Sequence, residues 1–231
     1  IENFRCFKNY EVDLTPGITV FIGKNGAGKT SLLNAIRYGL SVFFSNDSTM
    51  GDDLLISGNP DLKVISTLAT DFYRAQNADL PAVDLTINME AEFNDIPLNW
   101  EYYKRSTSGA SLFVSKYQQA YRTLMAEYHN SDQLPLFVFY SDSFPHIDTR
   151  TSDFAKKAIK EQGYIIRNFA YYKWNSEVSC TSIWQNRFIN SMLKQISLND
   201  SDPLNSKEVE YIKNKLRTFS AVSYTHLTLP T

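Results

Sequence analysis

Apolar and polar residues alternate without a break over residues 83–93, which is the period of a strand that buries one face. A polar, turn-forming stretch follows at residues 94–97, and the alternation returns at Leu98, Trp100 and Tyr102. Two alternating runs joined by a short turn predict an antiparallel hairpin. We expect Trp100 to pack in the core on the buried face of this hairpin.

Apolar residues at helical spacing occur in three parts of the chain. Residues 117–128 predict a helix, and the pattern from residue 153 onward predicts a helical lobe. The remaining helix is predicted at residues 31–40, with an apolar face formed by Leu32, Leu33, Ile36 and Leu40.

Two short, continuously apolar runs predict buried strands instead. One lies at residues 18–22 and the other at residues 134–140, where Pro135 would stand at the start because proline cannot donate to a sheet ladder. Residues 45–53 between these runs are polar and contain glycine, so they read as a loop.

The segment between the first predicted strand and the first predicted helix reads Gly-Lys-Asn-Gly-Ala-Gly-Lys-Thr and matches the pattern G-x-x-x-x-G-K-[ST]. Strand, glycine-rich loop and helix in this order form a phosphate-binding loop. The backbone N–H groups of residues 25–30 would converge on phosphate oxygens, with the positive end of the helix dipole behind them. The predicted nucleotide-binding residues are Gly23, Lys24, Asn25, Gly26, Ala27, Gly28, Lys29, Thr30 and Ser31.

Each polar side chain of this loop has an expected role. Lys29 would reach the β- and γ-phosphates and is the predicted catalytic residue. The Thr30 hydroxyl would bind Mg²⁺, which prefers hard oxygen ligands. Ser31 would support this shell from behind.

The residues around the loop resemble the opening of the RecF/SMC-like ATPases, which are relatives of ABC-type nucleotide-binding heads. The resemblance rests on the N-F-R-x-F sequence at residues 3–7, the Pro-Gly turn at residues 16–17 and the stretch at residues 25–36. It covers residues 1–40.

This resemblance implies an α/β P-loop NTPase of the ABC/SMC-head type, incomplete here, with an antiparallel β-layer and a helical lobe. It implies ATP and Mg²⁺ as cofactors and a homodimer or head-to-head partner that closes around two ATP molecules. It also implies work on DNA in repair, chromosome maintenance or anti-phage defence. Arg5 matches the strand-end arginine of the family, and its role stays open between a surface cation and a nucleotide contact.

Several parts that the family uses are missing. The sequence contains no convincing L-S-x-G signature, no apolar strand that ends in Asp-Glu and no His after such a strand. Residues 55–58 resemble a signature but follow the loop too closely, and residues 136–142 end in an Asp without the Glu that would polarise water. We read the latter run as a core strand. The γ-phosphate-sensing Gln cannot be assigned among Gln76, Gln118 and Gln119.

Both ends of the chain look cut. It begins at Ile1 without Met, and one reading frame of a transposase adapter used in sequencing libraries encodes residues 222–231. We therefore expect the natural sequence to end near residue 221. The expected organisation is strands, loop and first helix at residues 1–44, a β-rich part at 45–150 and the helical lobe at 151–221. Such a chain should bind ATP but hydrolyse it poorly.

Composition adds little to this picture. The 231 residues are 43% hydrophobic, enough for one sizeable core, and a formal net charge of −2 does not demand a polyanionic partner. Cys6 and Cys180 are far apart, which suits reduced thiols and a cytoplasmic protein, and no run is long enough to cross a membrane. His129 and His146 lack partners at metal spacing.

A cluster of aromatic residues at Tyr171, Tyr172 and Trp174 beside a lysine could stack on bases, although core packing is the commoner use of such a pattern.

Three other functions fit a phosphate-binding loop. A P-loop small-molecule kinase would need an arginine-rich lid, and a GTPase would need an N-K-x-D guanine reader; the sequence shows neither. A nucleotide-gated scaffold that hydrolyses little ATP stays open.

Overall fold

We describe the protein from a computed structural model, which describes residues 1–45, 63–107, 112–131 and 133–139, together with Tyr171 and the positions 207, 210, 211, 213–215, 217 and 218. The chain divides into two compact units, Ile1–Asp142 with Ile166–Glu177, and Ser143–Ile165 with Val178–Thr231. In the second unit the described positions between 207 and 218 are helical. Residues 45–150 and 151–221 as separate parts of the chain remain a prediction.

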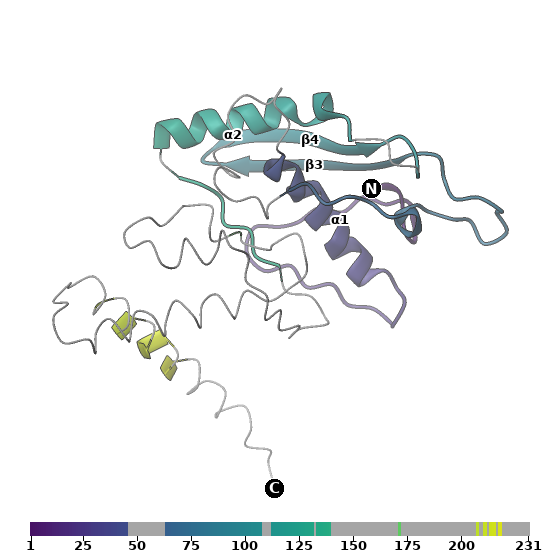
Figure 1. The fold of residues 1–231 in the computed structure, drawn as a ribbon. Helices are drawn as coiled ribbons and strands as arrows, with labels where there is room; N and C mark the ends of the chain where they lie inside the picture. The colour runs from purple at the N-terminus through teal and green to yellow at the C-terminus, as the bar shows by residue number, and fades with distance from the viewer. Residues whose placement is uncertain are drawn as a thin grey trace, which may run out of the picture. The chain divides into compact units, whose positions relative to one another are not determined.

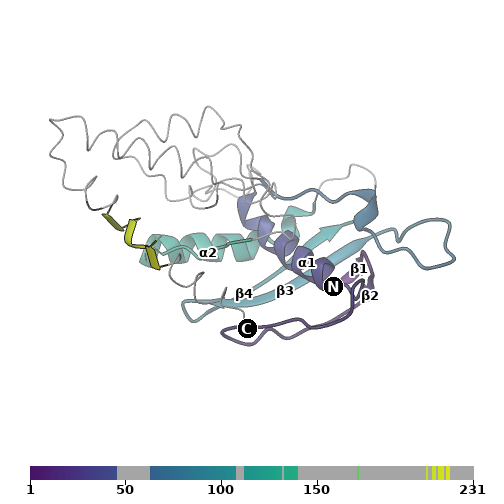
Figure 2. The same ribbon diagram turned by 90° about the horizontal axis from the view of Figure 1, so that it is seen from below.

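The first unit is built on one four-stranded antiparallel sheet with the order β2-β1-β3-β4. Its strands are β1 (Glu2–Phe4), β2 (Phe7–Asn9), β3 (Leu85–Phe93) and β4 (Ile96–Lys104). Strands β1 and β2 form a tight hairpin in which Phe4 pairs with Phe7, and Glu2 of β1 pairs with Thr86 of β3. The N-terminal hairpin is thereby joined to a hairpin far along the sequence (Figures 1 and 2).

The β3–β4 hairpin confirms the alternation that predicted it. Its register runs from Leu85 opposite Lys104 to Phe93 opposite Ile96. Asn94 and Asp95 form the turn with φ values of 51° and 62°, the left-handed pair that a two-residue hairpin turn requires. The alternation buries Leu85, Ile87, Leu98, Trp100 and Tyr102.

Two helices cover the buried face of this sheet, α1 (Lys29–Ser41) and α2 (Gln118–Ser131). Both contact the β3–β4 hairpin, and Figure 1 shows α1 crossing it. The opposite face of the hairpin stays open to solvent, because Asn88, Glu90 and Asn99 are exposed. Short 3-10 turns at η1 (Val42–Phe44), η3 (Ala69–Asp71) and η4 (Val114–Lys116) complete the described elements.

The core lies between the two helices and the sheet and is rich in aromatic rings. Phe43 meets Trp100 edge to face with ring centroids 5.0 Å apart, and Tyr38 packs in the same way on Phe4 at 5.5 Å. The Trp100 indole N–H donates to the carbonyl of Gly39 at 2.8 Å, which fixes α1 to β4. The prediction that Trp100 packs in the core is confirmed.

The helix α1 is confirmed, and its predicted apolar face is confirmed in part, because Leu32 is buried and Leu40 packs against the core. Leu33 is 45% exposed, whereas Asn34, Arg37 and Ser41 are buried. Polar groups are tolerated there because they find partners inside the protein: Asn34 Nδ2 donates to the Thr30 carbonyl at 2.9 Å and the Ser41 hydroxyl to the Tyr38 carbonyl at 2.7 Å.

Residues 18–22 do not form the predicted buried strand. No strand pairing includes them in the described part of the chain, and Ile18, Val20 and Ile22 are 90%, 71% and 93% exposed. An apolar run becomes a buried strand only where a neighbour pairs with its backbone and a layer covers its side chains, and neither is found for this run among the described residues.

Residues 133–139 likewise lack the regular strand predicted for residues 134–140. Leu136 and Val138 are 71% and 58% exposed, while Phe137 and Phe139 on the alternate positions pack against the core. The Phe137 ring lies 6.1 Å from that of Phe44, and Phe139 lies beneath the Arg37 guanidinium at 4.6 Å. The segment is therefore extended and half-buried, with one row of side chains open.

Candidate functional site

The phosphate-binding loop leads directly into α1, which begins at Lys29. Gly28 caps the helix in the left-handed conformation, with φ at 92°, and Gly26 has φ at 82°. Side-chain-bearing residues avoid such values, so the two glycines let the backbone turn sharply into the helix. The first turn of α1 contains no acidic residue. No side chain of this turn therefore neutralises the positive end of the helix dipole at the free N–H groups.

The ammonium group of Lys29 lies inside this loop. It donates to the carbonyl of Gly23 at 2.7 Å and to that of Lys24 at 2.9 Å. One side chain thus bridges the helix start to the beginning of the loop. The cation is placed where the strongest negative charge of a ligand would have to go.

The remaining predicted site residues lie together and are open to solvent. Residues 23–27 and Thr30 are exposed, and Ser31 is partly exposed at the start of the helix. The Thr30 carbonyl is held by Asn34, which leaves the Thr30 hydroxyl available. Thr30 is the residue that would hold Mg²⁺, an ion that neutralises charge on transferring phosphate oxygens.

The β1–β2 turn packs against the loop at Gly28. A Cβ atom at position 28 would lie 2.8 Å from the Sγ of Cys6 and 2.9 Å from the Cζ of Phe7. Both distances are shorter than any normal contact, so the turn and the loop can approach this closely only because residue 28 has no side chain.

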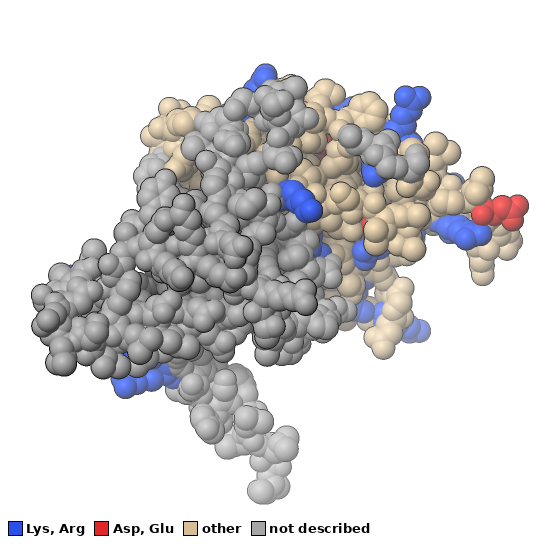
Figure 3. All heavy atoms as spheres, in the orientation of Figure 1, with Lys and Arg blue, Asp and Glu red and all other residues tan. Residues whose placement is uncertain are grey.

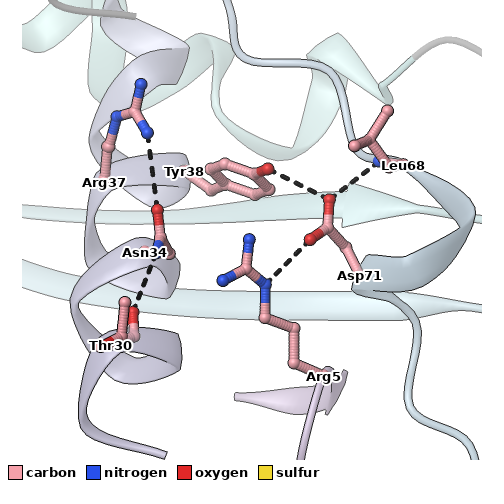
Figure 4. A network of polar contacts seen from close by, with 7 residues as sticks. All are labelled: Arg5, Thr30, Asn34, Arg37, Tyr38, Leu68 and Asp71. Carbon is pink, nitrogen blue, oxygen red and sulfur yellow. Dashed lines mark hydrogen bonds and ion pairs between the residues drawn. The ribbon is translucent and has the colours of Figure 1, made fainter. Parts of the chain in front are cut away.

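A polar network lies beside α1 and includes Arg5 (Figure 4). Arg5 Nε pairs with Asp71 Oδ1 at 2.9 Å, and the Tyr38 hydroxyl donates to Asp71 Oδ2 at 3.1 Å. The Leu68 N–H donates to the same oxygen at 2.8 Å. Burial, reinforced by the nearby carboxylate, raises the pKa of Tyr38 to about 12. Arg5 is therefore paired with Asp71 and is not a free surface cation. A contact between Arg5 and a nucleotide stays a prediction.

Asp71 and Tyr38 are the residues that the sequence did not reveal. Asp71 lies 66 positions from its partner Arg5, outside every periodic segment, and a lone acidic residue in a loop carries no signal of its own. Tyr38 lies on the predicted helix and could have been marked as a buried hydroxyl that needs an acceptor.

The other candidate residues gain no role in this site. Tyr171 is 3% exposed, packs on Phe44 with centroids 5.4 Å apart and donates its hydroxyl to the Pro135 carbonyl, so it is a core residue. Tyr172, Trp174, Cys180, His146 and residues 55–58 lie outside the described residues. The choice among Gln76, Gln118 and Gln119 stays open.

Within the described ranges, no three His, Cys, Asp or Glu side chains gather closely enough to hold a metal ion. Cys6 is a free, exposed thiol. None of the helices in the described part of the chain has the length and apolar character needed to cross a bilayer.

On the face drawn in Figure 3, the visible Lys and Arg side chains of the described residues are scattered and do not form one continuous patch. The open face of the β3–β4 hairpin carries Glu90, Glu92 and Glu101. Glu101 pairs with Lys116 at 2.9 Å, so part of this negative charge is neutralised.

Comparison with known proteins shows the family of the chain. A family model described as AAA domain matches residues 1–222 of the 231. The chain belongs to the AAA domain family. Two proteins similar to this chain are the DNA replication and repair protein RecF of Nocardioides sp. (53% identical over 38 residues) and that of Lactobacillus acidophilus (44% identical over 55 residues).

A third relative is the DNA double-strand break repair Rad50 ATPase of Halobacterium salinarum, 41% identical over 56 residues. These matches cover 16%, 24% and 24% of this chain for the Nocardioides, Lactobacillus and Halobacterium proteins, and 9%, 14% and 6% of those proteins. The AAA domain is therefore of the RecF/SMC-like kind, and the chain matches a small part of the length of each relative.

Proposed function

We propose that residues 23–31 bind the triphosphate of ATP together with Mg²⁺. The observation that carries the proposal is the position of Lys29, whose ammonium lies 2.7 Å from the Gly23 carbonyl, within the curve of the loop and next to the free N–H groups of the α1 start. Nucleotide binding would exchange two carbonyl acceptors for phosphate oxygens, which are stronger acceptors because they are charged.

The residues present fit the ligand. Two left-handed glycines keep side chains out of the curve, Lys29 supplies a cation, and the exposed Thr30 hydroxyl supplies a hard oxygen for Mg²⁺. Thr30 would hold Mg²⁺, and the bound ion would supply positive charge against the negative charge that develops on the phosphate during transfer. The protein's own part is to orient the phosphates and to hold a positive charge at Lys29.

The proposal extends to hydrolysis in the complete protein. Water would attack the γ-phosphate in line with the leaving oxygen, in a head that dimerises around ATP. The family and the names of its relatives support this extension, together with a role in DNA repair or maintenance or in anti-phage defence. If DNA binds, the acidic open face of the β3–β4 hairpin would not be its contact.

Titration calorimetry with ATP and Mg²⁺ tests the first step. We expect saturable binding to the unmodified chain and a loss of about 10- to 100-fold in affinity in Lys29→Ala, because a charge-assisted hydrogen bond contributes about 1.5–3 kcal/mol. Lys63→Ala is the matched control, since Lys63 is an exposed lysine outside residues 23–31, and its affinity for ATP should not change. Equal binding by Lys29→Ala and the unmodified chain would refute the proposal.

Phosphate release and oligomeric state test the second step. An ATP-dependent dimer of the complete protein that Lys29→Ala abolishes, with turnover that DNA stimulates, is the expected result. A monomer that phosphorylates a small metabolite would point to a kinase instead.

A further inference from the structure

Asp71 joins three separate elements through one buried carboxylate. The residue is 2% exposed, and its two oxygens accept from Arg5 of the β1–β2 turn, from Tyr38 of α1 and from the Leu68 N–H at the start of η3. Its backbone carbonyl also accepts from the Arg5 N–H at 2.7 Å. Arg5 is thus held at both its main chain and its side chain by the same residue.

This double contact stabilises a conformation that Arg5 would not adopt readily. Its φ is 49°, in the left-handed region that residues with a side chain rarely occupy. Such strain persists where the surroundings determine the conformation from several sides. The buried carboxylate in turn needs the guanidinium, because a buried charge without a partner is costly.

The residues that follow Arg5 reach the phosphate-binding loop. Cys6 and Phe7 lie against Gly28, where no Cβ could be accommodated. Through Arg5, Asp71 therefore holds the turn that packs on Gly28, and through Tyr38 it holds α1, nine residues after the helix begins at Lys29. Figure 4 shows Arg5 and Tyr38 converging on the two oxygens of Asp71.

We propose that Asp71 is a positioning residue for the phosphate-binding loop, acting through Arg5 and the β1–β2 turn. This inference rests on the proposed nucleotide binding by residues 23–31. Asp71 does not touch the ligand; through Arg5 it holds the turn whose residues Cys6 and Phe7 pack against Gly28, and hence the direction of the N–H groups at Gly28 and Lys29. The binding of a triphosphate depends on several N–H donors that point at its oxygens at the same time. A small displacement of the turn that packs against Gly28 therefore weakens all of these hydrogen bonds.

The experiment measures the affinity for ATP and Mg²⁺ in Asp71→Asn. The amide keeps the shape of the side chain but gives Arg5 Nε no charged acceptor, so we expect binding about tenfold weaker than in the unmodified chain, at a temperature where the variant is folded by circular dichroism. Glu101→Gln is the matched control, since Glu101 pairs with Lys116 at 2.9 Å on the surface, with exposed side-chain fractions of 37% and 44%. Its affinity should not change.

A double substitution separates action through Arg5 from a general loss of packing. If Asp71 acts through Arg5, then Arg5→Gln alone weakens binding to a similar extent, and Arg5→Gln with Asp71→Asn is no weaker than either single variant. The inference would be overturned if the loss of affinity in the double variant equalled the product of the two single losses. It would also be overturned if Asp71→Asn bound as tightly as the unmodified chain.

Chemical labelling of the exposed Cys6 thiol gives a second measurement. Its result would not change if Asp71 only stabilised the fold. In a Cys180→Ser background, ATP with Mg²⁺ should slow the labelling of Cys6 by a thiol reagent, because the thiol lies against Gly28. In Asp71→Asn this protection should be lost at ATP concentrations that still saturate the site. Full protection in the variant would contradict the proposal.

The two proposals fail in different ways. If the unmodified chain does not bind ATP, the proposed function fails; if it binds, Lys29→Ala does not, and Asp71→Asn binds normally, only the positioning role fails. Should Asp71→Asn not fold, Arg5→Gln carries the test, because it breaks the link from Asp71 to the β1–β2 turn. We expect binding about tenfold weaker in Arg5→Gln, and unchanged binding would overturn the role.

Discussion

Gly28 and Cys6 lie so close that a Cβ atom on residue 28 would come within 2.8 Å of the cysteine sulfur. The N-terminal hairpin and the phosphate-binding loop are consequently a single packed unit. Mutations in the hairpin and mutations in the loop should therefore affect the same property, the affinity for nucleotide.

Gly28→Ala and Gly26→Ala form a matched pair. Both glycines have positive φ, but no atom lies within 4 Å of a Cβ built at position 26, so that variant should lose about 1 kcal/mol from backbone strain alone. Gly28→Ala adds the clash with Cys6 and Phe7 and should lose about 3 kcal/mol and all measurable ATP binding. Urea unfolding and calorimetry measure the two effects. Equal losses would show that the close contact is unimportant.

The turn of the β3–β4 hairpin offers a stabilising change. Asp95 has φ at 62°, so Asp95→Gly should relieve strain and raise the free energy of unfolding by on the order of 0.5 kcal/mol. Asn94→Gly is the control: Asn94 Nδ2 donates to Glu127 Oε1 at 2.8 Å, and loss of this bond should cancel the gain. Thermal unfolding of both variants tests the prediction, and a destabilised Asp95→Gly would contradict it.

Trp100→Phe should destabilise the fold by about 2 kcal/mol. The change removes the indole N–H that donates to the Gly39 carbonyl and leaves space among buried rings. Tyr103→Phe, three positions further along β4 and on the other face of the strand, should cost less than about 0.5 kcal/mol. Denaturant unfolding followed by far-ultraviolet circular dichroism compares them. Similar losses of stability in the two variants would show that the hydrogen bond and packing of Trp100 do not account for the effect.

Alkaline pH should weaken the fold through Tyr38. Its pKa is raised to about 12, so the protonated phenol is the form that the folded state stabilises. This stabilisation is complete below the unfolded pKa near 10 and is lost as pH rises toward 12, by on the order of 2 kcal/mol. Tyr38→Phe should be less stable at neutral pH by about 1 kcal/mol and should show a shallower decline above pH 10. Urea unfolding at pH 8, 10 and 11 measures this, and parallel declines would contradict it.

The features that sequence patterns predicted correctly are those that depend on neighbouring residues. The helix that starts at Lys29, the α2 helix and the β3–β4 hairpin each follow from local periodicity and turn chemistry. The loop was equally visible, because its glycines and Lys29 are consecutive in the sequence.

The errors concern residues whose surroundings come from distant parts of the chain. Residues 18–22 are as apolar as a buried strand, yet apolar character does not say whether a neighbouring strand is present. Asn34 and Arg37 are buried because their partners lie close in the folded helix, and neither belongs to the apolar face that was predicted. The pairing of Arg5 with Asp71 depends on the register between β1 and residues 71–73, and no local pattern encodes that register.

The bare aliphatic side chains of Ile18, Val20 and Ile22 have a practical consequence. A group of uncovered branched apolar side chains favours self-association between copies, so turbidity and light scattering should rise with protein concentration. Binding isotherms recorded in dilute solution would then measure nucleotide binding by the loop, whereas isotherms of concentrated samples would also contain heat from aggregation.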